Sequence, residues 1–268
     1  MASMTVKEVL AVLDSLAPFC LAESWDHVGL RAGFPDAEVH GAAFFLDATA
    51  WSVRRAADSG CDLLVTHHPL MFGAQENMIC DRPESKAVQV AFSRGVSVIS
   101  CHTNLDSAKC GVNDVLSRLA GMSGLVPMEP PSDEKGFGMG AVGDVAPCSC
   151  EDFCGRTARA WKLSGYRFFD SGRTIKRVAL CGGAGGSMWR TALEKGADIY
   201  ATADMRYNEV LDALDAGLSL MICDHGEMEN NVMKPFSENF AERVPIPVVL
   251  LDGVAADEKH SYGWRSPE

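Results

Sequence analysis

Two adjacent histidines that follow a short apolar run are the most informative chemical feature of the sequence. The run 63–66 (Leu-Leu-Val-Thr) is typical of a buried strand, and His67 and His68 come directly after it. Pro69 stops the strand and favours an extended backbone at His68. In an open parallel sheet, ligands bind beyond the carboxyl ends of the strands. Both imidazoles are therefore expected at the ligand-binding edge of such a sheet.

Other imidazoles and carboxylates follow apolar runs in the same way. One run is followed by His102-x-x-x-Asp106 and another by His225-x-x-x-Glu229. Imidazole and carboxylate together suit Zn, Fe and Mn. Because strand side chains alternate in direction, the adjacent histidine pair fits better as ligands of two ions than as a chelate of one. Two ions about 3.5–4 Å apart are a recurring hydrolytic device.

Three further features have more than one interpretation. Asp47 also follows an apolar run, but it could instead cap the next helix. The glycine-rich run 182–186 follows a strand pattern, so it is either a tight strand-to-helix turn or an anion cradle built from helix amides. Cys148, Cys150 and Cys154 have a spacing that matches no standard zinc pattern, and are either a metal site or incidental thiols at the start of a helix.

The composition narrows the class of protein. The chain has 268 residues, of which 47% are hydrophobic and 22% charged, as in an ordinary globular protein with a sizeable core. A net charge of -12 argues against nucleic-acid binding, which needs a basic patch. The apolar runs are too short for a membrane span, and several of the ten cysteines lie within them as small buried hydrophobes do. We expect a cytoplasmic protein with no membrane association.

Strand and helix patterns alternate along the chain, which predicts an α/β fold with mostly parallel strands and right-handed crossovers. The predicted helices are 5–16, 50–59, 85–93, 112–119, 156–163, 188–195, 207–216 and 233–241. The predicted strands are 42–46, 63–66, 96–101, 176–181, 198–201, 218–223 and 247–251. We expect a first α/β lobe at 1–120, a connecting segment rich in Gly and Pro at 121–150, and a second α/β segment at 151–268.

These residues, taken together, match a pattern of motifs found in a known protein family. The chain resembles the Nif-three-like dinuclear metal-centre family, whose members are often labelled GTP cyclohydrolase type-two homologues. The motifs that carry the resemblance occur in the expected order over almost the whole chain. They are Leu16-Ala17-Pro18, Trp25-Asp26-His27-Val28-Gly29-Leu30, Thr66-His67-His68-Pro69-Leu70-Met71-Phe72, His102-Thr103-Asn104-Leu105-Asp106, Gly111-Val112-Asn113-Asp114, Cys181-Gly182-Gly183-Ala184-Gly185, the segment from Asp198 to Asp204, and His225 with Glu229.

The resemblance implies two divalent metal ions per subunit (Zn, Fe or Mn). The implied ligands are His67, His68, Asp106, His225 and Glu229, with Glu229 as the bridging ligand. It also implies two α/β lobes with the metal site between them at strand carboxyl ends, and hexameric rings whose metal sites face an internal cavity. His102 would lie close by, as a supporting residue or an occasional ligand. As the candidate catalytic residue we consider His102, and His225 is the alternative, for moving protons if the ring is not a metal ligand.

The function expected from these features is that of a metal-dependent hydrolase of the cyclohydrolase or amidohydrolase kind. Its substrate would be a small polar molecule, such as the nucleotide GTP. The alternative is a protein without enzymatic activity that holds metal as a chaperone, sensor or regulatory partner. The chain departs from the family pattern at five positions, which leaves every implied ligand in place but alters its surroundings. These are His27, Ala203, Asn208, Asp224 and Met228.

Overall fold

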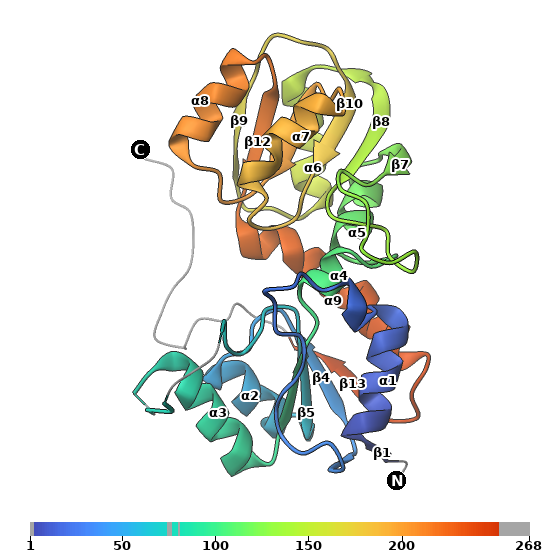
Figure 1. Ribbon diagram of the computed structural model, residues 1–268, viewed down its shortest axis with the longest axis vertical. Helices are drawn as coiled ribbons and strands as arrows, with labels where there is room; N and C mark the ends of the chain where they lie inside the picture. Colours follow the sequence, from blue (N-terminus) through green and yellow to red (C-terminus); the bar gives the residue numbers. More distant parts are fainter. Residues whose placement is uncertain (1–2, 74–76, 80, 252–268) are drawn as a thin grey trace. The chain divides into compact units, whose positions relative to one another are not determined.

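The computed structural model describes residues 3–73, 77–79 and 81–251, which form two compact units (Figure 1). The described residues of the first unit run to Leu105 and resume at Met233, and the second unit is Asp106–Val232. Two helices contain the boundaries between the units: α4 (Thr103–Asp106) and α9 (His225–Ala241). The chain therefore passes from one unit to the other within helices.

The first unit is built around a five-stranded sheet in the order β13-β4-β5-β6-β2. All neighbours pair in parallel except β2 and β6. A separate antiparallel pair joins β1 to β3. The elements are β1 (Met4–Thr5), α1 (Val6–Leu16), η1 (Phe19–Leu21), β2 (Gly29–Ala32), β3 (Glu38–Val39), β4 (Ala42–Phe45), α2 (Ala50–Asp58), β5 (Leu63–Thr66), α3 (Pro83–Arg94), β6 (Ser97–Ser100) and β13 (Val248–Leu250).

Helices cover both faces of this sheet, which is why every residue of β4, β5 and β6 is buried. One face packs against α2 and α3 through a core that includes Val53, Ala87 and Ala91. On the other face, the Phe44 ring lies 5.5 Å from Phe236 and 5.2 Å from Phe240, both in the second half of α9. Helix α1 lies on the side of the sheet opposite to α2 and α3 (Figure 1).

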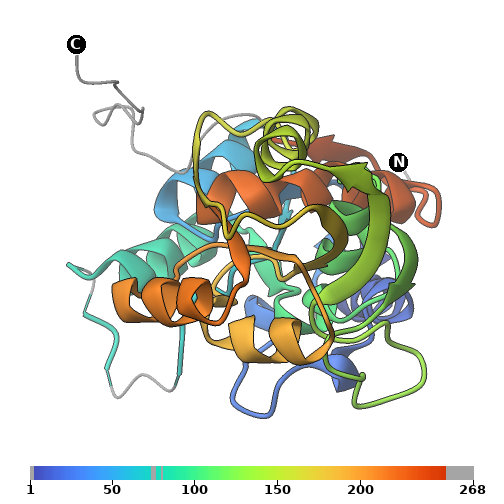
Figure 2. The ribbon, with the colours of Figure 1, turned by 90° about the horizontal axis from the view of Figure 1, so that it is seen from above.

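The second unit is built around a six-stranded sheet in the order β7-β8-β10-β11-β12-β9. Only β10, β11 and β12 pair in parallel, and the other pairs are antiparallel. Figure 2 shows α7 and α8 on one side of this sheet and α6 on the other. The elements are α5 (Val112–Leu119), β7 (Ser123–Val126), β8 (Ala141–Cys148), α6 (Cys150–Ala160), β9 (Tyr166–Phe169), β10 (Ile175–Leu180), η2 (Gly186–Met188), α7 (Trp189–Glu194), β11 (Ile199–Thr202), α8 (Tyr207–Asp215) and β12 (Ser219–Cys223).

The α/β class is confirmed, while several sequence-based details need correction. The expected mostly parallel pairing holds for the five-stranded sheet, whereas the six-stranded sheet is mixed, because β7, β8 and β9 pair antiparallel. Strands β7 and β8, within the stretch 121–150, were not predicted, because Gly124 and Pro147 interrupt their pattern. The edge strands β2 and β9 were not predicted, because their partly exposed residues form no continuous apolar run. Helix α6 begins at Cys150 instead of 156, and α9 begins at His225 instead of 233.

The division into lobes at 1–120, 121–150 and 151–268 stays a prediction. The compact units divide the chain differently, because the residues from Met233 to the end of β13 return to the first unit. Residues 252–268 lie outside the described part of the chain. Within the described part, no helix is both long enough and apolar enough to cross a membrane.

Candidate metal centre

The histidine pair begins where β5 ends, and hydrogen bonds fix its backbone there. The amides of His67 and His68 both donate to the Leu46 carbonyl, at 3.1 and 2.9 Å. The Thr66 hydroxyl donates to the His68 carbonyl at 2.8 Å. The chain therefore turns immediately after the strand, as the Pro69 position indicates, and the two imidazoles lie at the carboxyl end of the first sheet.

The three histidine rings of the first unit are each held through Nδ1. The acceptors are Cys101 O for His67 (2.9 Å), Asp47 Oδ1 for His68 (2.7 Å) and Asp26 Oδ2 for His102 (3.0 Å). An oxygen acceptor at Nδ1 favours the tautomer with the proton on that nitrogen, in which Nε2 is the atom that could bind a metal. Metal sites in which a carboxylate or carbonyl orients the histidine have the same arrangement.

The same three rings lie close together. The His67 ring centroid is 5.0 Å from that of His68 and 5.2 Å from that of His102, and the His68 and His102 centroids are 5.9 Å apart. His67 is fully buried. The carboxyl ends of the neighbouring strands β5 and β6 thus bring three imidazoles to one place, as the sequence pattern predicts.

Asp26 is the main supporting residue that sequence reasoning missed as part of the site. Besides His102, the Thr103 amide (3.1 Å) and the Thr103 hydroxyl (2.6 Å) donate to its carboxylate. Burial raises the pKa of Asp26, but the hydrogen bonds from His102 and Thr103 outweigh it and bring the pKa well below its usual range. Asp26 is therefore a carboxylate that holds the imidazole ring in position.

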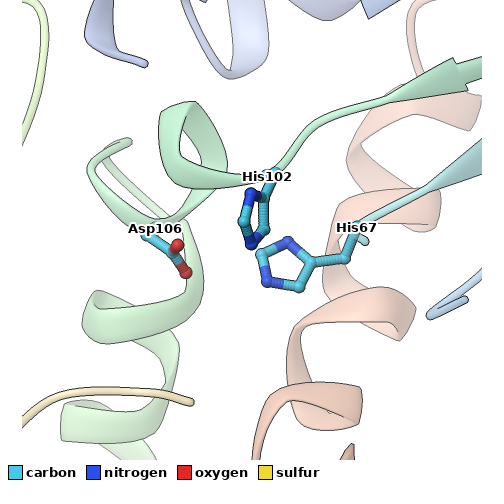
Figure 3. A group of neighbouring side chains, drawn as sticks. All are labelled: His67, His102 and Asp106. Carbon is cyan, nitrogen blue, oxygen red and sulfur yellow. The ribbon is translucent and has the colours of Figure 1, made fainter. Parts of the chain in front are cut away.

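Asp106 is the last residue of α4, the single turn that begins next to His102. One ligand atom from each of His67, His102 and Asp106 lies within 4.8 Å of the others. Figure 3 shows the Asp106 carboxylate on the side of its helix that faces the two rings. Two imidazoles and a carboxylate at this spacing could hold a divalent cation.

The second unit supplies another histidine–carboxylate pair, at the carboxyl end of β12. His225 is the first residue of α9, and its Nε2 lies 3.0 Å from Oε2 of Glu229, one turn further along the helix. On its other side, His225 Nδ1 lies 2.6 Å from Asp204 Oδ2. The Glu229 side chain is buried, with 4% exposed. His225 is thus supported through Nδ1 in the same way as the histidines of the first unit.

The glycine run after β10 packs against this pair. Gly183 has a φ of +64°, and a Cβ there would collide with Glu229 Oε1 and lie 3.0 Å from His225 Nε2. The Gly183 carbonyl accepts hydrogen bonds from the Ala203 amide (3.0 Å) and the Thr202 hydroxyl (3.2 Å). Only a residue without a side chain fits so close to the Glu229 carboxylate, which explains a glycine at this position.

Asn113 connects Asp106 to the same glycine run within the second unit. Its Nδ2 donates to the Asp106 carbonyl (3.1 Å), and its Oδ1 accepts from the Gly182 amide (2.9 Å). Burial, together with the negative charges of Asp106 and Glu229, raises the pKa of the Cys181 thiol. Asn113 thus joins the Asp106 backbone to the turn that packs against Glu229.

The supporting contacts settle the interpretation of Asp47. Thr49 caps α2, accepting from the Ser52 amide at 3.1 Å, whereas the Asp47 carboxylate contacts His68. The thiols of Cys148, Cys150 and Cys154 belong to no close donor group in the described part of the chain. The candidate centre therefore consists of nitrogen and oxygen donors, which fits a divalent ion such as Zn, Fe or Mn.

Comparison with known proteins identifies the family. The sequence matches the Duf34/NIF3 (NGG1p interacting factor 3) family over residues 4–255. The chain belongs to this family. The resemblance noted from the His-His-Pro and His-Thr-Asn-Leu-Asp motifs is thereby confirmed.

Curated relatives of this Duf34/NIF3 protein carry a cyclohydrolase name. It is 33% identical over 218 residues to the GTP cyclohydrolase 1 type 2 homolog of Streptomyces coelicolor, covering 78% of this chain and 75% of the relative. It is 30% identical over 220 residues to a Helicobacter pylori protein named GTP cyclohydrolase 1 type 2, covering 82% of this chain and 85% of the relative.

Solved structures share its fold. A Staphylococcus aureus protein has a TM-score of 0.85 and 25% identity, covering 97% of this chain and 99% of that one. Reduced HcgD of Methanocaldococcus jannaschii has a TM-score of 0.81 and 26% identity, covering 94% and 100%. The two-lobed α/β architecture predicted from the sequence agrees with these structures.

Three departures from the family pattern have a definite place in the structure. Asp224 Oδ1 accepts from the Glu227 amide at 2.9 Å, which stabilises the first turn of α9. Met228 is fully buried beside Glu229 in the sequence. Ala203 is also buried, and its amide bonds to Gly183. Nothing in the structure explains the histidine at 27 or the exposed asparagine at 208.

Proposed function

We propose that this protein is a metal-dependent hydrolase of the cyclohydrolase or amidohydrolase type, acting on a small polar or nucleotide substrate such as GTP. The observation that carries the proposal is that four imidazoles at strand ends are each held in place by a hydrogen-bond acceptor. Each of His67, His68, His102 and His225 has an oxygen acceptor at Nδ1. Such support is typical of histidines that bind a metal through Nε2.

The proposed ligands of two divalent ions are the five residues implied by the family resemblance. Glu229, whose carboxylate lies against Gly183 and His225, is the proposed bridging ligand. Zn, Fe and Mn all suit this donor set. The ligands are His67, His68, Asp106, His225 and Glu229.

When bound, two such ions would supply electrophilic activation of the substrate and a water nucleophile at neutral pH. In this proposal, His102 moves a proton at Nε2, because Asp26 holds the opposite nitrogen and keeps the ring in position. Asp47 and Asp204 would orient the rings of His68 and His225 in the same manner. The buried position of His67 and Glu229 would keep bulk water away from their donor atoms.

The names of the relatives support a nucleotide substrate, since several are called homologues of GTP cyclohydrolase. We further propose that the protein works in the cytoplasm as a homohexamer, as the family resemblance implies. A net charge of -12 agrees with a small-molecule substrate and not with nucleic acid.

The test is turnover by the protein loaded with Zn, Fe or Mn in separate preparations. GTP is the first substrate, followed by other nucleotides and cyclic amides. We expect hydrolysis that is lost in His68→Ala and retained in His40→Ala. His40 is a matched control, because its Nδ1 also contacts a carboxylate (Asp62 at 2.8 Å) but it lies at the opposite end of β4.

Metal analysis of the same preparations separates the two readings of the site. Tight binding of two ions without hydrolysis of any substrate would contradict the hydrolase and favour a protein that stores, senses or delivers metal. Activity that His68→Ala retains would contradict the assigned site. Size-exclusion chromatography with light scattering measures the proposed hexamer.

A further inference from the structure

Two exposed aromatic side chains flank His102. The Trp25 ring centroid lies 6.2 Å from that of His102, and the Phe72 centroid lies 5.9 Å from it. Trp25 is 60% exposed and Phe72 is 64% exposed. The interplanar angles with the imidazole are 77° and 80°, so neither ring stacks on it. Large apolar surfaces therefore remain open to solvent directly beside a proposed catalytic residue.

The backbone on either side of Trp25 is anchored. Asp26 binds His102 and Thr103, and the Glu23 amide donates to the Thr103 hydroxyl at 2.9 Å. A turn joins the two anchors, with the Asp26 amide donating to the Glu23 carbonyl at 2.9 Å. The tryptophan is thus held out at the tip of a turn that is attached to the start of α4.

Phe72 is positioned from the other side of the site. It follows the histidine pair by four residues, and the intervening Leu70 is buried, with 2% of its surface exposed. Leu70 packs in the core between the first sheet and its helices. The segment that presents His68 therefore also presents Phe72, and both aromatic rings reach His102 from anchored segments.

A second exposed aromatic pair in the same unit provides a comparison. Phe34 and Phe92 are 66% and 54% exposed, and their centroids lie 6.0 Å apart at 70°. These two rings contact each other, so their mutual packing is sufficient to explain why they lie together. Trp25 and Phe72 instead both contact the same imidazole, at the place where donor residues converge.

We propose that Trp25 and Phe72 bind the planar heteroaromatic ring of a nucleobase-like ligand beside His102. The proposal rests on the small-molecule substrate of the proposed function and assigns the part of the site that selects it. Base–aromatic stacking is an established source of affinity and needs no positive charge. This suits a chain of net charge -12, in which the side chains that orient the histidines are carboxylates.

The experiment measures binding by isothermal titration calorimetry, with zinc-loaded full-length protein and two probes. GMP carries a purine, and ribose 5-phosphate carries the same sugar and phosphate without a base. We expect Trp25→Ala to weaken GMP binding about tenfold or more. Phe72→Leu should weaken it by a smaller factor, whereas Trp25→Phe should retain most of the affinity because an aromatic face remains.

Two controls make the result specific. Binding of ribose 5-phosphate should be the same in Trp25→Ala and in the unaltered chain, and Phe34→Ala should leave GMP binding unchanged. The proposal is overturned if GMP does not bind the unaltered chain at millimolar concentration. It is also overturned if Trp25→Ala binds GMP as the unaltered chain does, including the case in which the substitution alters the oligomeric mass but not GMP binding.

The outcome is distinguishable from that of the proposed hydrolase. GMP binding that depends on Trp25, in a protein that hydrolyses nothing, would retain the base site and contradict the hydrolase. Hydrolysis of GTP that proceeds with equal KM in Trp25→Ala and Phe34→Ala would retain the hydrolase and contradict the base site. Trp25→Phe keeps the test valid should the alanine variant fold poorly.

Discussion

The carboxylate of Asp204 lies 2.6 Å from Nδ1 of His225, and its backbone adopts a left-handed conformation, with φ at +48°. Few residues other than glycine, asparagine and aspartate adopt this region readily. The chain therefore places an aspartate in a rare backbone conformation directly behind a proposed metal ligand. The strained backbone of Asp204 occurs where its carboxylate orients the His225 ring. Backbone strain of this kind is common at functional sites.

Replacing Asp204 by asparagine should weaken metal binding with little effect on folding. Asparagine tolerates the left-handed region and keeps the shape of the side chain, but it removes the negative charge that supports His225. We expect zinc affinity to fall about 10- to 100-fold, measured by competition with a chromophoric chelator. Asp212→Asn is the control, because Asp212 is an exposed carboxylate of the same unit. Equal affinity in both variants would contradict a supporting role for Asp204.

Replacing Gly183 by alanine should abolish the part of the site formed by Glu229. Two effects act there: the left-handed backbone and the collision of the new Cβ with the Glu229 carboxylate. Gly172 isolates the first effect, since it has a φ of +79° and nothing within 4 Å of an added Cβ. We expect Gly172→Ala to lose only about 1–2 kcal/mol of stability. Gly183→Ala should in addition lose bound metal, measured by elemental analysis, and retention of a full metal complement would refute this.

Asn113 should stabilise the fold through its two backbone contacts. Alanine at this buried position would leave the Asp106 carbonyl and the Gly182 amide without the amide side chain that bonds them. We expect the free energy of unfolding to fall by about 1–3 kcal/mol, measured by urea denaturation. The exposed Asn208 serves as the control, and Asn208→Ala should change stability by no more than about 0.5 kcal/mol. A similar effect of both substitutions would argue against the bridging role.

The cysteines should divide sharply in their reactivity toward a thiol reagent. Burial raises the pKa of Cys101 to about 12, and burial with the charge of Asp224 raises the pKa of Cys223 to about 12. Because the thiolate is the reactive form, both should resist iodoacetamide in the folded protein between pH 7 and 9 and react once it is unfolded. The exposed Cys20 and Cys110 should react in the native state. Peptide mass spectrometry locates the modified residues, and native labelling of Cys101 would show that its surroundings open.

The metal-ligand candidates were more predictable from the sequence than the residues that hold them. His67, His102 and His225 follow strands that are buried on both faces, and such strands appear in the sequence as short, mostly apolar segments. Asp26 lies in an irregular loop more than seventy residues before His102 in the sequence. No local periodicity marks such a residue, because only the tertiary fold brings it to the ring.

The same distinction holds for the elements. Strands β5 and β12 were predicted within one residue of their ends, since their side chains are buried along the whole length. The edge strand β9 pairs on one side only and leaves Arg167 and Phe168 exposed, so its composition resembles that of a loop. The start of α9 was missed because His225 and Glu229 occupy its first turns, where polar side chains break the apolar period.

The Nδ1 contacts of the histidines have a thermodynamic consequence. A side chain that must become ordered when a ligand arrives reduces the affinity by the conformational entropy that it loses. Here Asp47, Cys101 and Asp26 already fix the rings of His68, His67 and His102 within the first unit. The rotamer entropy of these rings is lost when the chain folds, before any ion binds. An ion therefore binds to nitrogens that are already ordered, and its affinity is not reduced by that entropy.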